Sequence, residues 1–427
     1  LKWLETPRLL FVVSIMTFML RLYSVLSLVS AAWGLMADSQ LRSSSDFHVY
    51  VQRFGREYVP GTAEYNHRLS LYEKRLEVIR AHNAKPDRLW TAGINSLTDR
   101  TEEEFKRLQG WHPSHRGGDR GAGSMNLLAE RNSVPFPAKV DWTKLESLQN
   151  PTDQGGCGSC WAVSAAATLA ARHEIHRGKV RSFSAQQLIN CVPNPKECGG
   201  QGGCRGATVE LALDYVKQMG LAEESAVPYQ AVDMTCPVSM LQSGPDRKQL
   251  HGGAAFGLVG YTTLPSNRAR PLMQALLAGP VAVTVAASDW MFYEAGIFDG
   301  CDKGAIVNHA VVMVGYGEES RAKYWTVQNS WGSAWGEEGG RLRLKRHDTP
   351  VQDDEFCGID SKPEDGIECK PYPEKVTVCG MCGILYDSVV PHFENIVGHA
   401  LNQQKATAKH LPAARHGGGA RNHKAKP

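Results

Sequence analysis

The sequence lacks a strong excess of charge of either sign. Its 427 residues contain 47 Lys and Arg against 44 Asp and Glu, a formal net charge of +3. Proteins that bind nucleic acid usually carry a pronounced basic surface, so we expect no nucleic-acid partner. The chain also contains no Asn-X-Ser/Thr sequon and no solenoid-length repeat, which excludes N-glycan-dependent sorting and repeat architectures.

A long uninterrupted apolar run is also missing. Two apolar stretches near the start, Leu9–Leu20 and Leu22–Val29, are separated by Arg21. A single membrane anchor through both would bury this arginine at a cost of a few kcal/mol. If translation begins at Met16 or Met19, Arg21 supplies the charged region of a signal peptide and the second stretch its apolar region. We therefore predict a cleaved signal peptide within residues 1–37 and no stable membrane span.

Cysteine, in contrast, is abundant. Eleven cysteines are many for a reducing cytosol. Setting one aside as a reactive thiol leaves ten, an even number that suits disulfide pairing. This indicates the secretory pathway, with a lysosomal, vacuolar or extracellular destination.

Composition divides the rest of the chain into four segments. Residues 38–111 are charged and show helical periodicity, and residues 112–133 are rich in Gly, Arg and Ser, as in an exposed linker. Residues 134–393 form a body rich in Cys, Gly and Trp. Residues 394–427 form a basic tail that we expect to be disordered, because it lacks the apolar residues that a core needs.

The body itself changes character halfway along. Trp161–His176 and Ala207–Met219 have the composition of helices, whereas Val281–Val285, Ala310–Val314 and Tyr324–Val327 are typical of buried strands. We predict an α+β fold with a helical lobe facing a β lobe, and an active site in the cleft between them.

The most informative segment is Gln154-Gly-Gly-Cys157-Gly-Ser-Cys160-Trp161. Glycines leave the approach to Cys160 open, and an Ala-rich helix begins directly after it. The positive end of a helix dipole stabilises a thiolate, and its free N–H groups can bind an oxyanion. Two other interpretations are open: a redox Cys157–Cys160 pair, and a zinc site completed by Cys379 and Cys382.

Two downstream motifs favour nucleophilic catalysis. Asn308-His309-Ala310 precedes a strand-like run, and Gln328-Asn329-Ser330-Trp331-Gly332 follows it. A nucleophile needs a base, and the base needs a polar group that fixes its tautomer. Cys160, His309 and Asn329 are the candidates for these three roles.

These motifs resemble those of the papain family of cysteine proteases, whose Cys-Gly-Ser-Cys-Trp signature stands at 157–161. The resemblance covers residues 46 to 393. It implies a two-lobe fold with a helical left lobe and a β-barrel-like right lobe, preceded by a mainly helical propeptide.

The resemblance also implies roles for the site residues. Cys160 would attack the scissile carbonyl, and His309 would shuttle the proton. Asn329 would orient the imidazole, and Trp331 would shield their hydrogen bond from water. Gln154 would donate its side-chain amide to the oxyanion, together with the Cys160 backbone N–H.

The substrate pocket follows from the same alignment. Gly206 and Ala310 would contact substrate, and Thr284 would line the pocket for the second residue before the scissile bond. Asp387 would lie at the base of that pocket if the closing strand follows Cys382. If the alignment runs through Cys357 instead, Asp360 takes that place.

The resemblance pairs Cys157 with Cys204 and Cys191 with Cys236. Cys301 would pair with Cys357 or Cys382, because both are followed by Gly-Ile and 362–378 is an insertion between them. Cys198 has no counterpart in the family, and two of the cysteines at 357, 369, 379 and 382 have none either.

Upstream, polar and apolar residues recur at intervals of three or four along one helical stripe. They resemble the ERFNIN pattern of cathepsin-L-type propeptides, and 93–99 resembles the second propeptide motif. The stripe consists of Glu64, Arg68, Tyr72, Arg75, Ile79 and Asn83.

From this resemblance we expect a cysteine endopeptidase made as a zymogen, without cofactor or metal. Its partners would be polypeptide substrates, its own propeptide and cystatin-like inhibitors, and we expect a monomer. An exopeptidase of the same family, a catalytically silent binding or storage protein on the same fold, and a thiol–disulfide oxidoreductase are the alternatives.

Overall fold

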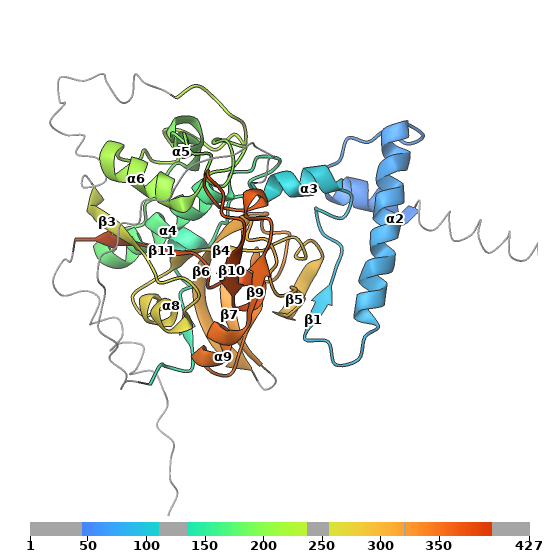
Figure 1. Ribbon diagram of the computed structural model, residues 1–427. Coiled ribbons are helices and arrows are strands. Elements are labelled where there is room, and N and C mark those ends of the chain that lie inside the picture. The colour runs from blue at the N-terminus through green and yellow to red at the C-terminus, as the bar shows by residue number, and fades with distance from the viewer. Residues whose placement is uncertain (1–44, 111–134, 237–255, 320–321, 395–427) are drawn as a thin grey trace, which may run out of the picture. The chain divides into compact units, whose positions relative to one another are not determined.

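The computed structural model describes residues 45–110, 135–236, 256–319 and 322–394 (Figure 1). The expected signal peptide, the linker at 112–133 and all but the first residue of the basic tail lie outside these ranges. The described residues form two compact units. One comprises 45–86 and 92–101, and the other comprises 87–91 together with 102 onward.

The first unit is built around one long helix. Residues 45–53 are helical, and α2 spans Ala63–Asn83. Thr62 caps α2 by accepting a hydrogen bond from the Tyr65 backbone N–H at 3.2 Å. An aromatic cluster fills the space between the two helices, with Phe47, Tyr50 and Tyr72 among its fully buried members.

The predicted ERFNIN stripe faces the interior of this unit from Arg68 onward, whereas Glu64 at its start is exposed. Arg68 donates to the Asp99 carbonyl at 3.0 Å, and Arg75 donates to the Leu97 carbonyl at 3.2 Å. Asn83 exchanges two hydrogen bonds with the backbone of Ala92. The stripe therefore holds the 93–99 motif against α2, a role that amphipathicity alone would not reveal.

Asp99 is the polar centre of the same unit. Its carboxylate is fully buried and lies 2.9 Å from the Arg56 guanidinium. Tyr50 and Tyr58 each donate a phenolic hydroxyl to it at 2.8 Å. A buried carboxylate is tolerated only with such a complete set of donors.

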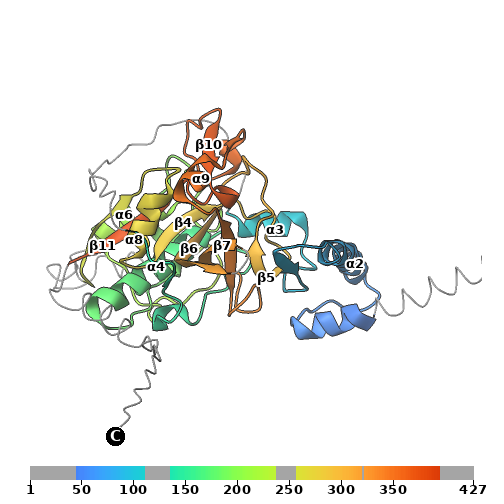
Figure 2. The same cartoon turned by 90° about the horizontal axis from the view of Figure 1, so that it is seen from below.

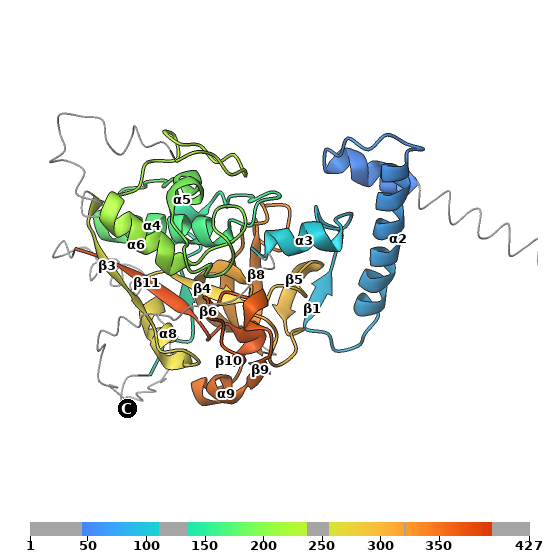
Figure 3. The same ribbon diagram turned by 45° about the horizontal axis from the view of Figure 1, so that its top comes forward.

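The second unit contains the two predicted lobes. Helices α4 (Cys160–Arg177), α5 (Ala185–Cys191) and α6 (Val209–Met219) group on one side, as Figure 3 shows in green. They share a buried apolar cluster that includes Trp161, Leu169, Leu188, Leu213 and Val216. The predicted helices at Trp161–His176 and Ala207–Met219 are confirmed to within two residues.

The strands form a mostly antiparallel sheet in the order β1-β5-β8-β7-β6-β4-β11-β3, with β2 paired to β6. The three predicted strands are confirmed. In the described residues this sheet does not close on itself, so the α+β class holds but the β lobe is not a barrel. The bounds are β1 Trp90–Ala92, β2 Val140–Asp141, β3 Leu258–Thr263, β4 Val281–Val285, β5 Tyr293–Phe298, β6 His309–Glu319, β7 Ala322–Gln328, β8 Arg341–Arg346 and β11 Ser388–Phe393.

Three shorter helices complete the picture: α3 (Glu102–Leu108), α8 (Ala269–Leu276) and α9 (Pro350–Glu355). β9 (Cys357–Asp360) and β10 (Val376–Cys379) pair as a separate ribbon. Figure 2 shows this ribbon beside α9. Among the described residues, no helix combines the length and apolarity needed to cross a membrane.

Five disulfides use ten of the eleven cysteines and leave Cys160 free. Cys157 is joined to Cys204 and Cys191 to Cys236, as the resemblance implied. Between the two partners left open for Cys301, the structure has Cys382.

The remaining pairs are Cys198–Cys369 and Cys357–Cys379. Three of the four sulfurs invoked for a redox pair or a zinc site are engaged elsewhere, because Cys157 is joined to Cys204 and not to Cys160, and Cys379 and Cys382 lie in different disulfides.

Candidate active site

The free thiol stands at the first turn of α4. Cys160 is the first residue of this helix and is 4% exposed. The backbone N–H groups of Ala310 and Trp161 donate hydrogen bonds to its sulfur. Ala310 belongs to β6, so this contact brings the start of the helical lobe against the start of the β lobe's longest strand.

His309 is the first residue of β6 and is 1% exposed. Its Nε2 lies 2.8 Å from Oδ1 of Asn329, which directly follows β7. The Ser330 backbone N–H also donates to this Oδ1 at 2.8 Å, which identifies the atom as an acceptor. Nε2 therefore carries the imidazole proton, and Nδ1 is left without a hydrogen-bond partner.

Trp331 covers this pair. Its ring centroid lies 5.1 Å from that of His309, and the side chain is 2% exposed. Trp290 and Trp335 pack around it, with centroid distances of 6.5 and 5.0 Å. The resulting aromatic shell excludes water, which strengthens the His309–Asn329 hydrogen bond.

Gln154 is fully buried, and both ends of its side-chain amide are engaged. Its Oε1 accepts a hydrogen bond from the Ser330 hydroxyl at 2.6 Å. Its Nε2 donates to the carbonyl oxygens of Cys157 and Leu108, at 2.9 and 2.8 Å. Ser330 thus fixes which end of the amide faces the site, and the residue pattern alone did not single out this role.

The end of α3 and the residues that follow it, up to Gly110, lie against Cys160 and Trp331. A methyl group placed on Gly110 would lie 3.6 Å from the Cys160 sulfur and 3.7 Å from Gly206 Cα. Phe105 of α3 packs edge-on against Trp331, with 5.5 Å between ring centroids. The backbone from Phe105 to Gly110 therefore runs past Trp331, Gln154 and Cys160 in turn and buries the thiol.

This burial sets the protonation states. Burial raises the pKa of the Cys160 thiol to about 11, although the surrounding N–H groups partly offset the effect. Burial also lowers the pKa of His309 to about 4, against a smaller opposing effect of the Asn329 hydrogen bond. In this occluded form, removal from water disfavours both charged species, the thiolate expected from the helix dipole and the imidazolium.

The candidate pocket residues lie together beside His309. Thr284 of β4 pairs with Ala310 of β6, and the Thr284 backbone N–H donates to the Asp387 carbonyl at 3.0 Å. Asp387 is 6% exposed. The alternative residue, Asp360, lies on β9 of the separate ribbon, and its carboxylate accepts from the Lys362 N–H.

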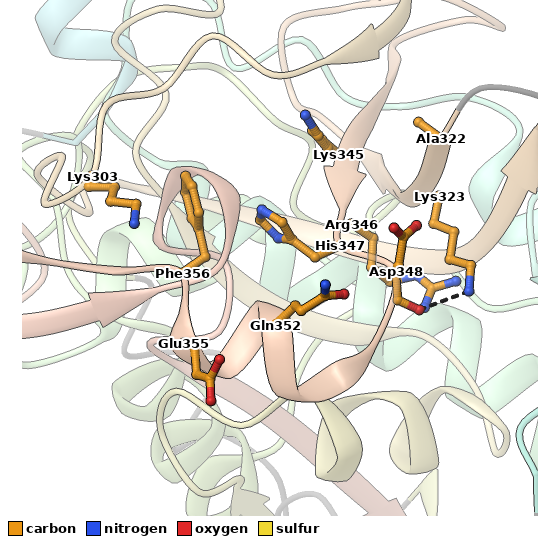
Figure 4. Close-up of a pocket in the computed structure, with 10 residues that line it drawn as sticks. All are labelled: Lys303, Ala322, Lys323, Lys345, Arg346, His347, Asp348, Gln352, Glu355 and Phe356. Carbon is orange, nitrogen blue, oxygen red and sulfur yellow. Dashed lines mark hydrogen bonds between the residues drawn. The ribbon is translucent and has the colours of Figure 1, made fainter.

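A second hollow, of about 380 Å³, lies away from these residues between β8 and α9 (Figure 4). Several of its polar side chains already have partners. Lys323 donates to the Asp348 carbonyl at 2.8 Å, Lys303 lies 4.6 Å from the Phe356 ring centroid, and His347 contacts Asp353 at 2.8 Å.

Comparison with known proteins agrees with this geometry. The papain family cysteine protease domain matches residues 136–366, and the cathepsin propeptide inhibitor domain matches residues 47–105. The chain is 36% identical over 328 residues to a cathepsin L-like proteinase of Fasciola hepatica, which covers 75% of this chain and 93% of that protein. It is 32% identical over 354 residues to a KDEL-tailed cysteine endopeptidase of Arabidopsis thaliana, covering 79% and 91%.

Solved structures show the same similarity. Digestive procathepsin L2 from Tenebrio molitor larval midgut matches with a TM-score of 0.64 at 28% identity, covering 82% of this chain and all of that one. A recombinant stem bromelain precursor matches with a TM-score of 0.63 at 26% identity, covering 83% and 100%. The chain therefore belongs to the papain family of cysteine proteases, as a precursor that carries a cathepsin-type propeptide inhibitor domain.

Proposed function

We propose that this chain is the zymogen of a cysteine endopeptidase in which Cys160 is the nucleophile and His309 the general base. The arrangement of Cys160, His309 and Asn329 supports this proposal. The free thiol stands at a helix start beside β6, and the tautomer of His309 is fixed by Asn329. Two of the relatives are named endopeptidases, which supports cleavage within chains over the exopeptidase alternative.

The chemistry proceeds through an acyl-enzyme. Once the propeptide has left, the proton moves from the Cys160 sulfur to Nδ1 of His309, and the thiolate attacks the scissile carbonyl carbon. Gln154 Nε2 and the Cys160 N–H stabilise the resulting oxyanion. His309 returns its proton to the leaving amine, and water then hydrolyses the thioester and regenerates the thiol.

The propeptide would inhibit by occupying the cleft in the direction opposite to a substrate. The Leu108 carbonyl takes the hydrogen bond from Gln154 that an oxyanion would take, and Gly110 lies against Cys160. Activation would follow at acid pH. Cleavage would fall in 112–133, because linker sequences rich in small and polar residues are preferred sites of proteolytic cutting.

We further propose a route through the secretory pathway to an acidic vacuole or lysosome, or to the outside of the cell. Five disulfides suit an oxidising compartment. Polypeptides would be the substrates, cystatin-like proteins would be inhibitors, and the enzyme would act as a monomer.

The proposal is tested with an epoxide inhibitor that alkylates catalytic thiols. The processed enzyme should incorporate one inhibitor per chain and lose all peptidase activity. Cys160→Ala should fold, incorporate none and hydrolyse no peptide. Hydrolysis by this variant at a rate near that of the wild type would exclude Cys160 as the nucleophile.

A further inference from the structure

The insertion between β9 and β10 crosses from the β lobe to the helical lobe. The two strands pair as an antiparallel ribbon closed by the Cys357–Cys379 disulfide. The loop between them contains residues 366–370, here called the strap. Sequence comparison with the family left this insertion and Cys198 without a role.

One side of the strap is fastened to the helical lobe. Cys369 is joined to Cys198, in the loop that follows α5. The Gly199 N–H donates to the Glu368 carbonyl at 3.1 Å, and the Lys370 ammonium lies 2.7 Å from the Glu197 carboxylate. A covalent bond, a backbone hydrogen bond and an ion pair thus hold the same few residues.

The other side is fastened to the β lobe, close to the catalytic histidine. The Ile367 N–H donates to the carbonyl of Val307, two residues before His309, at 3.0 Å. Ile367, Val307 and Val378 share a small buried apolar cluster. Tyr386 directly precedes Asp387 in the chain, and its hydroxyl donates to the Glu368 carboxylate at 2.5 Å.

The position of the strap along the cleft follows from Gly206. A methyl group on Gly206 would clash with the carbonyl oxygens of both Gly110 and Gly199. Gly199 is the residue that bonds to the strap. The strap therefore lies next to Gly199 and Gly206, the residues beside Gly110. Residues 105–110 of the propeptide contact Trp331 through Phe105 at their other end.

We propose that the strap closes the acyl side of the substrate cleft beyond the pocket for the second residue. This rests on the proposed function, which places that pocket at Thr284, Ala310 and Asp387. A substrate residue third from the scissile bond meets the strap and must leave the cleft, so it gains no ordered contacts. Specificity on the acyl side is then concentrated in the first two residues.

The test is a length series of fluorogenic peptides with the same two residues before the scissile bond, extended on the acyl side by none, one or two alanines. For wild-type enzyme, kcat/KM should change by less than about twofold across the series. An open cleft would gain about fivefold, the value of one ordinary hydrogen bond. A fivefold gain in the wild type overturns the proposal without any variant.

The variant Cys198→Ala/Cys369→Ala/Lys370→Ala frees the strap from the helical lobe and should recover that gain. The matched control is Cys357→Ala/Cys379→Ala, which also removes one disulfide but leaves the strap tied to Cys198; its series should stay flat. A flat series in the freed variant would show that the strap does not close the cleft. If that variant does not fold, Lys370→Ala alone keeps every disulfide and should show a smaller gain.

Active-site titration with the epoxide inhibitor measures the concentration of active enzyme, and each hydrolysis rate is divided by that concentration. If no peptide in the series is hydrolysed and no inhibitor is incorporated, the proposed peptidase function fails. If the enzyme reacts with the inhibitor and kcat/KM rises with peptide length, only the strap proposal is refuted.

Discussion

The side-chain amide of Gln154 donates a hydrogen bond of 2.8 Å to the carbonyl of Leu108. Leu108 ends α3, a helix that begins within the propeptide domain match at 47–105 but belongs to the compact unit of the peptidase. The donor proposed for the transition state is thus occupied by a carbonyl of the same chain. Inhibition and catalysis compete for one N–H group, and this competition is the basis of the first prediction.

Replacing Gln154 with Ala should lower kcat of the processed enzyme by about 10²–10³-fold, the usual loss for one oxyanion donor. KM should change little, because the bond is made in the transition state. The control is Ser330→Ala, which removes only the hydroxyl that orients the amide at 2.6 Å. Its loss should be smaller. Equal losses, or a loss confined to KM, would contradict the oxyanion role.

The reactivity of Cys160 should depend on pH differently before and after processing. In the precursor, burial raises the pKa of the thiol to about 11 and lowers that of His309 to about 4, so both groups are neutral at pH 7. Its alkylation rate by iodoacetamide should be low at pH 7 and rise continuously towards pH 10. In the processed enzyme an ion pair can form, and the rate should be high and nearly constant from pH 5 to 8.

Cys160 is the one unpaired cysteine, so labelled peptide can be assigned without ambiguity. Precursor in which Cys160→Ala has been introduced gives the background. A precursor that is alkylated as fast at pH 6 as the processed enzyme would show that the occluded thiol is already ionised.

The buried ion pair of Asp99 with Arg56 should hold the propeptide unit together and restrain processing. Losing the Asp99 charge leaves Arg56 buried without a counter-ion, which costs several kcal/mol. Asp99→Asn should therefore loosen the propeptide unit and allow processing at a higher pH than in the wild type, as measured by gel over a pH series.

Glu64→Gln is the matched control for this prediction. Glu64 is 53% exposed, and its ion pair with Arg68 should contribute little to stability. Its processing pH should stay close to that of the wild type. A shift as large as that of Asp99→Asn would mean that the total charge of the unit, and not the buried carboxylate, controls activation.

Asp387 should govern acceptance of arginine as the second residue before the scissile bond. An ionised carboxylate at the base of the pocket offsets the cost of burying a guanidinium, whereas apolar residues gain only through burial. Asp387→Ala should lower the ratio of kcat/KM for an Arg peptide to that for a matched Phe peptide about tenfold or more. The control is Asp360→Ala, on the separate ribbon. An unchanged ratio in Asp387→Ala would place this residue outside the pocket.

The sequence by itself determined the local elements that carry the candidate site. Cys160 lies at a helix start because an Ala-rich segment follows a glycine-rich one, and His309 and Asn329 lie at the ends of runs typical of buried strands. Local propensity and apolar periodicity are written in adjacent residues, so these elements could be predicted to within a few residues. The two disulfides that the family resemblance implied, Cys157–Cys204 and Cys191–Cys236, are also present.

Only the tertiary structure decided the long-range partners. Cys301 has two candidate partners in equivalent local sequence, and the fold brings Cys382 to it, where the Cys382 carbonyl accepts from the Ala286 N–H at 2.8 Å. The Cys198–Cys369 bond joins residues 171 positions apart, a separation at which no local pattern carries information. The low thiol pKa expected of Cys160 from its helix start stays a prediction for the processed enzyme, whereas in this form burial raises that pKa to about 11. Desolvation depends on every atom that surrounds a group, and those atoms are brought together only by the folded chain.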